Sequence, residues 1–189
     1  MADNKPDSSR LPPFSRFLVR RRTFFSWALP LVLVLFADPW APLLVMGASL
    51  VAVGVGIRLW ASGHLVKSER LATSGPFSHL RNPLYLGSLV MLLGYCAMSA
   101  RWWSYPLFLA LFALFYYPTI RWEEEFLRGK FGKQYEDYVL QVPCFLPRLT
   151  AAYPNGERFS WLQAQRNGEL TSAALAAVMI ALFILRLVV

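Results

Sequence analysis

Charged side chains are scarce in this chain. Asp, Glu, Lys and Arg make up 16% of its 189 residues, whereas charged residues are about 25% of ordinary soluble domains. Hydrophobic residues account for 56%. This balance argues against a soluble domain and predicts an integral membrane protein.

Cysteine and histidine are almost missing, with two residues of each. Cys96 falls in an apolar segment and Cys144 in a polar one, so we expect no disulfide between them. Neither cysteine lies near a second cysteine or a histidine at metal-ligand spacing. We therefore predict no metal site.

Several sequence signatures are absent as well. The chain has no Walker loop, no His-Glu-x-x-His helix and no Ser–His–Asp order. Gly54-x-Gly56 follows no strand, so it is not a dinucleotide-binding fingerprint and makes room for a neighbouring helix or a ligand. The first 22 residues are polar and no small-residue cleavage site follows them, so we expect no cleavable signal peptide.

Five apolar segments make up most of the chain. They are Thr23–Phe36, Trp40–Trp60, Leu84–Ala100, Tyr105–Ile120 and Leu170–Val189. A spanning helix takes roughly 20 apolar residues, within about 17 to 25. The second and fifth segments meet this length, the third is at the lower limit, and the first and fourth are short. Within the second, Ala48, Ala52 and Gly56 recur every fourth residue, a small-residue spacing that predicts close contact with another helix.

The net charge of +8 could indicate a nucleic-acid partner, but the distribution of the cations argues otherwise. Nearly all of the 19 Lys and Arg residues precede the first apolar segment, lie between the second and third, or follow the fourth. With five spans, these three groups share one side, which the positive-inside rule assigns to the cytoplasm. We therefore expect no nucleic-acid partner, and we expect the N-terminus and the polar loops to be cytoplasmic.

Polar residues concentrate in two segments, Ser62–Pro83 and Arg121–Arg148. In the first, Pro83 suits the first turn of a helix and Asn82 is well placed as its N-cap. A helix N-terminus favours an anion, and the guanidinium of Arg81 suits a carboxylate. The alternative is that Arg81 only contacts lipid headgroups. His64 and His79 are expected more often to be hydrogen-bonding anchors than catalysts.

In the second segment, three adjacent acids directly follow the fourth span. Glu123, Glu124 and Glu125 are unfavourable at a cytoplasmic membrane surface, so we expect at least one to turn inward toward a cation. The alternative is a solvated face.

An apolar stripe of Leu127, Phe131, Tyr135 and Tyr138 follows the acids. It lies on the membrane or packs on the core, and for the two tyrosines an interfacial aromatic belt is the stronger interpretation. Gly129 and Gly132 interrupt this stripe, which predicts a broken or short helix.

Together these segments resemble a known pattern. "LATSGPFSHLRNPLYLG" resembles the Gly-Pro-Tyr … Arg-His-Pro-x-Tyr-x-Gly motif of the isoprenylcysteine carboxyl methyltransferase family. "EEEFLRGKFGKQYEDYVLQVPCFLPR" resembles the same family's Glu-Glu-x-x-Leu-x-x-x-Phe-Gly-x-x-Tyr-x-x-Tyr and Val-Pro-x-x-x-Pro signature. Two residues depart from the pattern: Phe77 replaces tyrosine, and Asn82 replaces a histidine. Asn82 cannot titrate near neutral pH as a histidine would.

The resemblance implies an all-α integral membrane helical bundle of about five transmembrane helices, with a cytoplasmic cofactor-binding loop and a C-terminal amphipathic segment. Residues 1–22 then form a polar, basic N-terminal segment. Residues 23–189 form a single membrane methyltransferase domain, with its cofactor-binding core at 58–148.

The resemblance also implies S-adenosyl-L-methionine as cofactor and a lipid or lipidated acceptor that enters from the bilayer. Arg81 and Glu124 are the expected catalytic residues. The expected cofactor contacts are His64, Leu65, Gly75, Pro76, Arg81, Asn82, Pro83, Tyr85, Glu123 and Glu124.

Two other functions stay open at this point. One is an NADPH-dependent reductase of membrane isoprenoids or sterols, although the chain lacks an obvious arginine cluster for the extra phosphate. The other is a non-enzymatic membrane scaffold or transporter subunit. The apolar segments contain no Asp, Glu or His, which argues against an ion-coupled transporter. The methyl acceptor and the oligomeric state cannot be read from these motifs.

Overall fold

The computed structural model describes residues 27–66, 70–154 and 156–188, and every regular element in these ranges is helical. The predicted all-α class is therefore confirmed, while the predicted basic segment 1–22 lies outside the described residues. The elements in chain order are the helix Trp27–Phe36, α2 (Ala41–His64), the 3-10 helix η2 (Gly75–Ser78), α3 (Pro83–Ser99), α4 (Ser104–Phe131), α5 (Lys133–Gln141), α6 (Trp161–Arg166) and α7 (Glu169–Val188).

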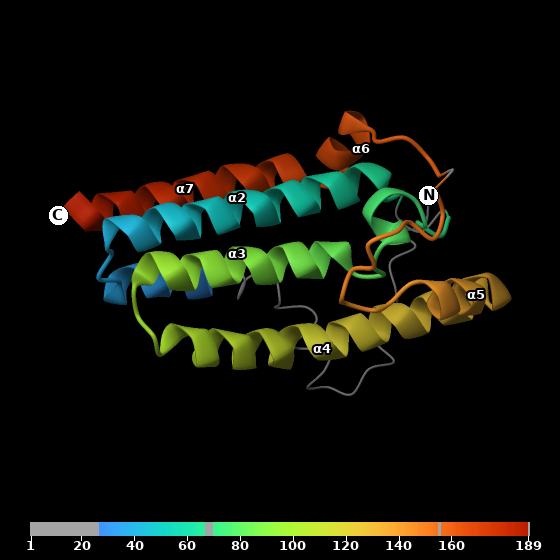
Figure 1. Cartoon of the computed structure of the whole chain (residues 1–189), viewed down its shortest axis with the longest axis horizontal. Helices are drawn as coiled ribbons and strands as arrows, with labels where there is room; N and C mark the ends of the chain where they lie inside the picture. Colours follow the sequence, from blue (N-terminus) through green and yellow to red (C-terminus); the bar gives the residue numbers. More distant parts are fainter. Residues whose placement is uncertain (1–26, 67–69, 155, 189) are drawn as a thin grey trace.

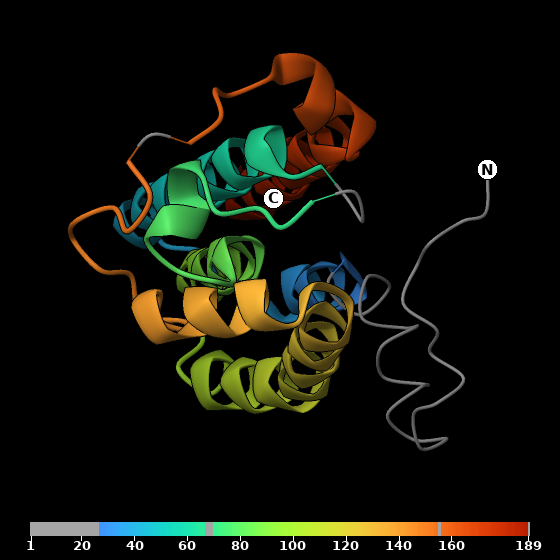
Figure 2. The same cartoon turned by 90° about the vertical axis from the view of Figure 1, so that its right-hand side faces the viewer.

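The long helices run side by side along one axis (Figure 1). α2 packs against both α3 and α7, and α4 lies on the other side of α3. The short elements η2, α5 and α6 gather at one end of the bundle, which Figure 2 shows from the front. We call this end, formed by η2, α5 and α6, the loop end. It carries both polar segments that the sequence singled out.

Among the described residues, two helices are long and apolar enough to cross a bilayer. α2 has 24 residues and α7 has 20, so at 1.5 Å per residue they measure about 36 and 30 Å, against about 30 Å for a bilayer's hydrocarbon core. The helix Trp27–Phe36 and α3 are shorter, and α4 carries charged residues along its second half. The structure thus supports two of the five expected spans, and the other three stay predictions.

Glycines set the contact between α2 and α3. A Cβ added at Gly54 would lie 2.6 Å from the carbonyl oxygen of Gly87, and Gly47 and Gly94 face each other equally closely. The predicted small-residue face of α2 is therefore wrong, because Ala52 is exposed and a Cβ at Gly56 would meet nothing within 4 Å. The face that packs is rotated by one residue from the predicted one, which is about 100° around a helix.

α4 continues without a break into the loop end. It runs through Gly129 and ends at Phe131, where Gly132 adopts a φ of 51°. The prediction that Gly129 interrupts the helix is therefore wrong, and only Gly132 ends it. α5 then turns back, and its Tyr135 and Tyr138 are buried against the apolar side of the loop end. The stripe packs on the core, so the aromatic-belt interpretation of these tyrosines is wrong.

Candidate functional site

An ion pair joins the start of α3 to the middle of the charged half of α4. The Nε and Nη2 atoms of Arg81 each lie 2.9 Å from Oε1 of Glu124. Both side chains are close to nine-tenths buried. Nη1 of Arg81 also donates to the carbonyl of Val142, at 2.9 Å. The expectation that one of the three acids turns inward toward a cation is confirmed, and that acid is Glu124.

The backbone around this pair holds Arg81 in place. Its N–H donates to the carbonyl of Pro143 at 2.9 Å, so the loop after α5 lies along the segment before α3. Burial alone would lower the pKa of Arg81, but the Glu124 carboxylate outweighs it and raises that pKa above its ordinary value. Arg81 therefore stays charged, and its donors are directed to groups of this chain.

Asn82 is the N-cap residue of α3 as predicted, but its side chain does not cap the helix. Its amide nitrogen instead donates toward Oε1 of Glu124 at 3.3 Å and the carbonyl of Cys144 at 3.2 Å. Its donors thus serve acceptors of α4 and of the loop after α5, and none of its side-chain atoms caps α3. Asn82 thus joins the ion pair to the loop after α5.

Cys144 completes this polar cluster, which we define as Arg81, Asn82, Glu124 and Cys144. Its Sγ atom lies 3.4 Å from the amide nitrogen of Asn82. Burial, and then the neighbouring Glu124 carboxylate, raise the pKa of the Cys144 thiol. The thiol is therefore held in its protonated form, which is a poor nucleophile.

An aromatic seam borders the polar cluster between α3 and α4. The ring of Tyr85, which is buried, lies 5.3 Å from that of Tyr116, and Tyr116 stacks on Phe112 at 4.3 Å. Phe145, one residue after Cys144, meets Phe112 edge-on at 6.4 Å. The seam therefore joins the first turn of α3 and the loop after α5 to the apolar half of α4.

Two buried tyrosines of α5 lie beside the cluster and differ in their partners. The Tyr138 hydroxyl donates to the carbonyl of Phe77 in η2 at 2.7 Å. The Tyr135 hydroxyl is buried and has no hydrogen-bond partner among the described residues. Burial is the main reason that the pKa of Tyr135 is raised to about 12, and the Glu124 carboxylate adds to it.

Four other expected cofactor residues form a second group around the end of α2, namely His64, Leu65, Gly75 and Pro76. The ring of His64 lies over Gly75, where an added Cβ would approach its atoms to 2.6 Å, and the φ of Gly75 is 56°. Both features favour glycine at this position. Nδ1 of His64 is hydrogen-bonded to the carbonyl of Trp60 at 2.9 Å, and Pro76 is fully buried beside this turn.

Glu124 also faces an open cleft, lined by Arg121, Glu124, Glu125 and Arg128 along one side of α4. The cleft therefore presents two acidic and two basic side chains. Glu123 is half-buried and does not line it.

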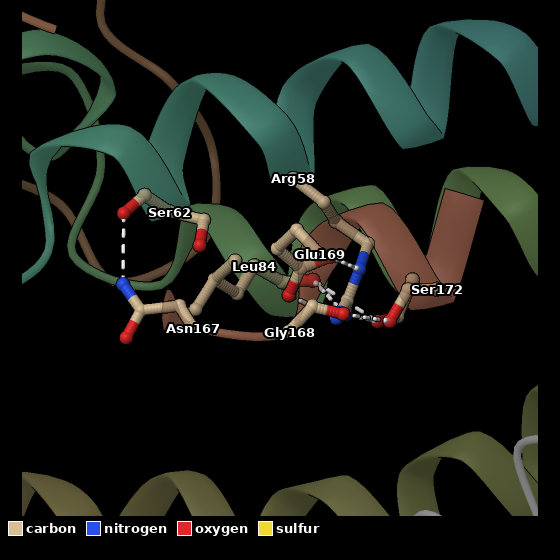
Figure 3. A network of polar contacts seen from close by, with 8 residues as sticks. Arg58, Ser62, Leu84, Asn167, Gly168, Glu169 and Ser172 are labelled. Atoms are coloured by element: carbon tan, nitrogen blue, oxygen red, sulfur yellow. Dashed lines mark hydrogen bonds and ion pairs between the residues drawn. The ribbon is translucent and has the colours of Figure 1, made fainter. Parts of the chain in front are cut away.

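A second Arg–Glu pair joins α2 to α7 (Figure 3). Arg58 binds Glu169 through two contacts, Nε to Oε2 at 3.0 Å and Nη2 to Oε1 at 2.7 Å. Its Nη1 donates to the hydroxyl of Ser88 at 2.6 Å and to the carbonyl of Leu84 at 3.3 Å, both in α3. One side chain therefore connects three helices at the level where α3 and α7 begin.

Comparison with known proteins gives three results. A family model described as phospholipid methyltransferase matches residues 42–134. The cobalt-zinc-cadmium resistance protein CzcN of Cupriavidus metallidurans is 35% identical over 66% of this chain and 53% of its own length. The nickel-cobalt-cadmium resistance protein NccN of Alcaligenes xylosoxydans xylosoxydans is 32% identical over 77% of this chain and 74% of its own. The chain belongs to the phospholipid methyltransferase family.

The resemblance to the isoprenylcysteine carboxyl methyltransferases is confirmed within this family. The protein-S-isoprenylcysteine O-methyltransferase of Schizosaccharomyces pombe is 33% identical over 46% of the chain. The chain spans about half the length of CzcN and 39% of the yeast enzyme. No solved structure matches the chain. The family match ends within α5, so α6 and α7 lie outside it.

Sequence reasoning missed several residues of this candidate site. Cys144 was considered only for a disulfide or a metal, yet it lies inside the Val-Pro-x-x-x-Pro segment beside Phe145. Arg58 was counted with the cations, although an arginine within an apolar helix usually has a specific partner. Nothing in the sequence pairs it with Glu169, 111 residues away.

Proposed function

We propose that this chain is a methyltransferase that uses S-adenosyl-L-methionine and acts on a lipid or lipidated acceptor within the membrane. Family membership supplies the reaction class. The single observation that carries the finer assignment is Glu124: Arg81 and Asn82 hold it from one side, and it opens on a charged cleft on the other. The aromatic seam lies beside it.

The charges of the cleft suit the donor's amino acid end, which carries an ammonium and a carboxylate. Glu124 and Glu125 would accept from the ammonium, and Arg121 and Arg128 would pair with the carboxylate. In this assignment Arg81 positions Glu124 and does not itself bind the carboxylate, because its donors already meet Glu124 and the carbonyl of Val142.

The seam suits the cationic sulfonium. Aromatic faces attract cations within about 6 Å of the ring centroid, and the rings of Tyr85 and Tyr116 meet between the first turn of α3 and the apolar half of α4. S-adenosyl-L-methionine supplies an already activated methyl group. The remaining task of the chain is to hold acceptor and donor in line, which by itself can account for most of a displacement's rate.

The polar cluster provides no group suited to remove a proton near pH 7. Asn82 does not titrate, the raised pKa of the Cys144 thiol keeps it protonated, and Glu124 is engaged by Arg81. An acceptor that arrives already ionised, a carboxylate or a thiolate, fits this cluster best. It would reach the cluster from the bilayer along the aromatic seam between α3 and α4.

Two relatives have names that refer to metal resistance. Metal binding is a less suitable function for this chain, because the described residues contain no group of three or more His, Cys, Asp and Glu side chains that could hold a metal ion. We therefore propose methyl transfer as the activity of this chain.

The test is ligand binding followed by methyl transfer. Saturating S-adenosylhomocysteine, at a hundred times its dissociation constant, should stabilise the detergent-purified protein by about 2.7 kcal/mol. Glu124→Gln should weaken its binding roughly 10- to 150-fold, because a hydrogen bond to a charged group is worth about 1.5–3 kcal/mol. Glu136→Gln, an exposed acid on α5, is the matched control and should bind as the parent does.

The acceptor is tested with methyl-labelled S-adenosyl-L-methionine and either a farnesylated cysteine analogue or phosphatidylethanolamine. Label in the farnesylated carboxylate would support an ionised acceptor, and label in the amine would contradict that part of the proposal. Stabilisation by NADPH and not by S-adenosylhomocysteine would contradict the methyltransferase and favour the reductase.

A further inference from the structure

We propose that the outer face of α6, together with Arg158 before it, is a binding surface for the headgroups of anionic phospholipids. This face exposes Trp161 at 66% and Leu162 at 57%, and Arg166 is exposed at the end of the same short helix. Two large apolar side chains between two cations are unusual on a surface that faces only water. α6 lies outside the family match, so this surface is a property of this chain's C-terminal part.

The orientation of α6 follows from its inner face. Ala164 is fully buried, and Asn167 donates to the carbonyls of Ser62 and Leu65, at 2.9 and 2.8 Å. Gln163 donates to the carbonyl of Leu65 as well, at 3.0 Å. These bonds satisfy carbonyls at the C-terminal end of α2, and they fix which side of α6 faces outward.

The Arg58–Glu169 pair places α6 at a membrane boundary. Glu169 is the first residue of α7, a helix long and apolar enough to span, and its partner Arg58 lies in the last two turns of α2, the other helix of that kind. α6 ends three residues before Glu169, on the outer side of this level. Tryptophan concentrates at such boundaries because its ring is apolar and its N–H is polar. Trp161 therefore lies where a headgroup layer begins.

The charge of the surface selects the lipid. Two acids flank this segment in the sequence, and both are already paired: Glu157 with Arg70, and Glu169 with Arg58. Arg158 and Arg166 therefore present net positive charge beside the apolar pair. An anionic headgroup complements this arrangement, and each cation near such a surface contributes roughly fivefold in affinity.

The surface is connected to the second group of expected cofactor residues. The ring of Phe159 fills the space beside Gly63 and lies 5.9 Å from the ring of His64. The N–H of Ser160 donates to the carbonyl of Gly63 at 3.0 Å. Lipid held on α6 would therefore order the end of α2. An effect on cofactor binding rests on the proposed function, whereas the lipid surface itself does not.

The position of Trp161 is tested in nanodiscs of phosphatidylcholine and phosphatidylglycerol. Phospholipids brominated near the glycerol end of the acyl chain quench nearby tryptophans. The fluorescence of the parent minus that of Trp161→Phe is the contribution of Trp161. We expect the brominated lipids to quench this contribution. A difference signal that no brominated lipid quenches would overturn the proposal. Trp161→Phe is a conservative change on the outer face of α6. The variant should therefore keep the fold, and its fluorescence can be compared directly with that of the parent.

The charge of the surface is tested by titrating phosphatidylglycerol into phosphatidylcholine micelles of the full chain, with thermal unfolding as the readout. Arg158→Gln/Arg166→Gln should need about thirtyfold more phosphatidylglycerol for the same stabilisation. Lys130→Gln/Lys133→Gln removes the same charge from exposed positions of α4 and α5 and should change the midpoint little. Equal losses in the two double variants would overturn the proposal.

The same titrations separate this proposal from the proposed function. Quenching of Trp161 and dependence on the two arginines, in a protein that binds no S-adenosylhomocysteine, would support the lipid surface and contradict the methyltransferase assignment. Tight S-adenosylhomocysteine binding with no lipid dependence would support the methyltransferase assignment and contradict the lipid surface.

Discussion

Replacing Glu169 by glutamine should destabilise the bundle, because it leaves the Arg58 guanidinium without its acidic partner. The variant keeps the shape of the side chain and removes the charge that faces Arg58 at 2.7 Å. Removing one partner of a buried ion pair costs about 3–5 kcal/mol, because the other charge stays buried without compensation. The Arg58 side chain is 22% exposed, so solvent relieves part of this penalty and we expect about 3 kcal/mol.

The chain offers a matched control in its exposed Arg–Glu pair. Arg70 and Glu157 are in contact, but their side chains are 52% and 44% exposed. Exposed pairs contribute about 0–1 kcal/mol. Glu157→Gln removes the same charge by the same chemistry, so the difference between the two variants measures what burial and the second contact of Arg58 add.

The assay is equilibrium unfolding in mixed micelles with increasing dodecyl sulfate, followed by tryptophan fluorescence. Arg58→Leu/Glu169→Leu should recover much of the loss of Glu169→Gln, because an apolar pair leaves no charge unpaired. The reasoning is refuted if Glu169→Gln and Glu157→Gln shift the unfolding free energy equally. It is also refuted if the double leucine variant is less stable than Glu169→Gln alone.

The remaining predictions use the same assay. Gly54→Ala should cost about 1–3 kcal/mol, because the new Cβ would lie 2.6 Å from a carbonyl oxygen of α3. Gly56→Ala, whose Cβ meets nothing within 4 Å, should be neutral or stabilise by up to about 1 kcal/mol. Equal effects of Gly54→Ala and Gly56→Ala on the unfolding free energy would refute the glycine contact. Tyr138→Phe should cost about 1–2 kcal/mol for its buried hydrogen bond to Phe77. Tyr135→Phe should cost nothing at neutral pH, because its hydroxyl has no described partner. Since the folded state raises the pKa of Tyr135 to about 12, an unfolded tyrosine releases its proton first, from about pH 10. Tyr135 should therefore contribute a fall of about 1.4 kcal/mol per pH unit between these two values, and Tyr135→Phe should remove that contribution. An unchanged alkaline profile of the variant would contradict the assignment.

The meeting of Arg81 with one of the three acids could be predicted from the sequence. A proline start for α3 places Arg81 at the mouth of one apolar helix, and the acids directly follow another apolar segment. Neighbouring antiparallel helices bring such ends together, and charges at a membrane boundary need partners. The spanning length of α2 and α7 could also be predicted from the sequence, because composition and length alone decide whether a helix can span.

The face of α2 that packs on α3 could not be predicted. Small residues mark more than one stripe of this helix, with Ala48, Ala52 and Gly56 four residues apart and Gly47 and Gly54 seven apart. A shift of one residue rotates the stripe by about 100°. Only the partner's glycines, Gly87 and Gly94, decide between the stripes. The burial of Tyr135 could not be predicted for a similar reason. A tyrosine stripe suits a lipid interface and a buried core alike, and the loop that covers it follows α5 in the chain.

The two Arg–Glu pairs together restrain the start of α3. Arg58 donates hydrogen bonds to the first turns of α3, at the Leu84 carbonyl and the Ser88 hydroxyl. Arg81 anchors the residues just before that turn to Glu124 of α4. The segment from Asn82 to Tyr85 is therefore held from both sides, by pairs that reach α7 on one side and α4 on the other.

This arrangement has a consequence for catalysis. In-line methyl transfer depends on holding two groups within a few tenths of an ångström of the reactive geometry. A loop at a lipid boundary would not provide that precision, because few contacts restrain it. Loss of Glu169, which is remote from the charged cleft, should then slow methyl transfer even where the variant is still folded. Loss of the exposed Glu157 should leave the rate unchanged, and this contrast separates positioning by the Arg58 network from a general loss of charge.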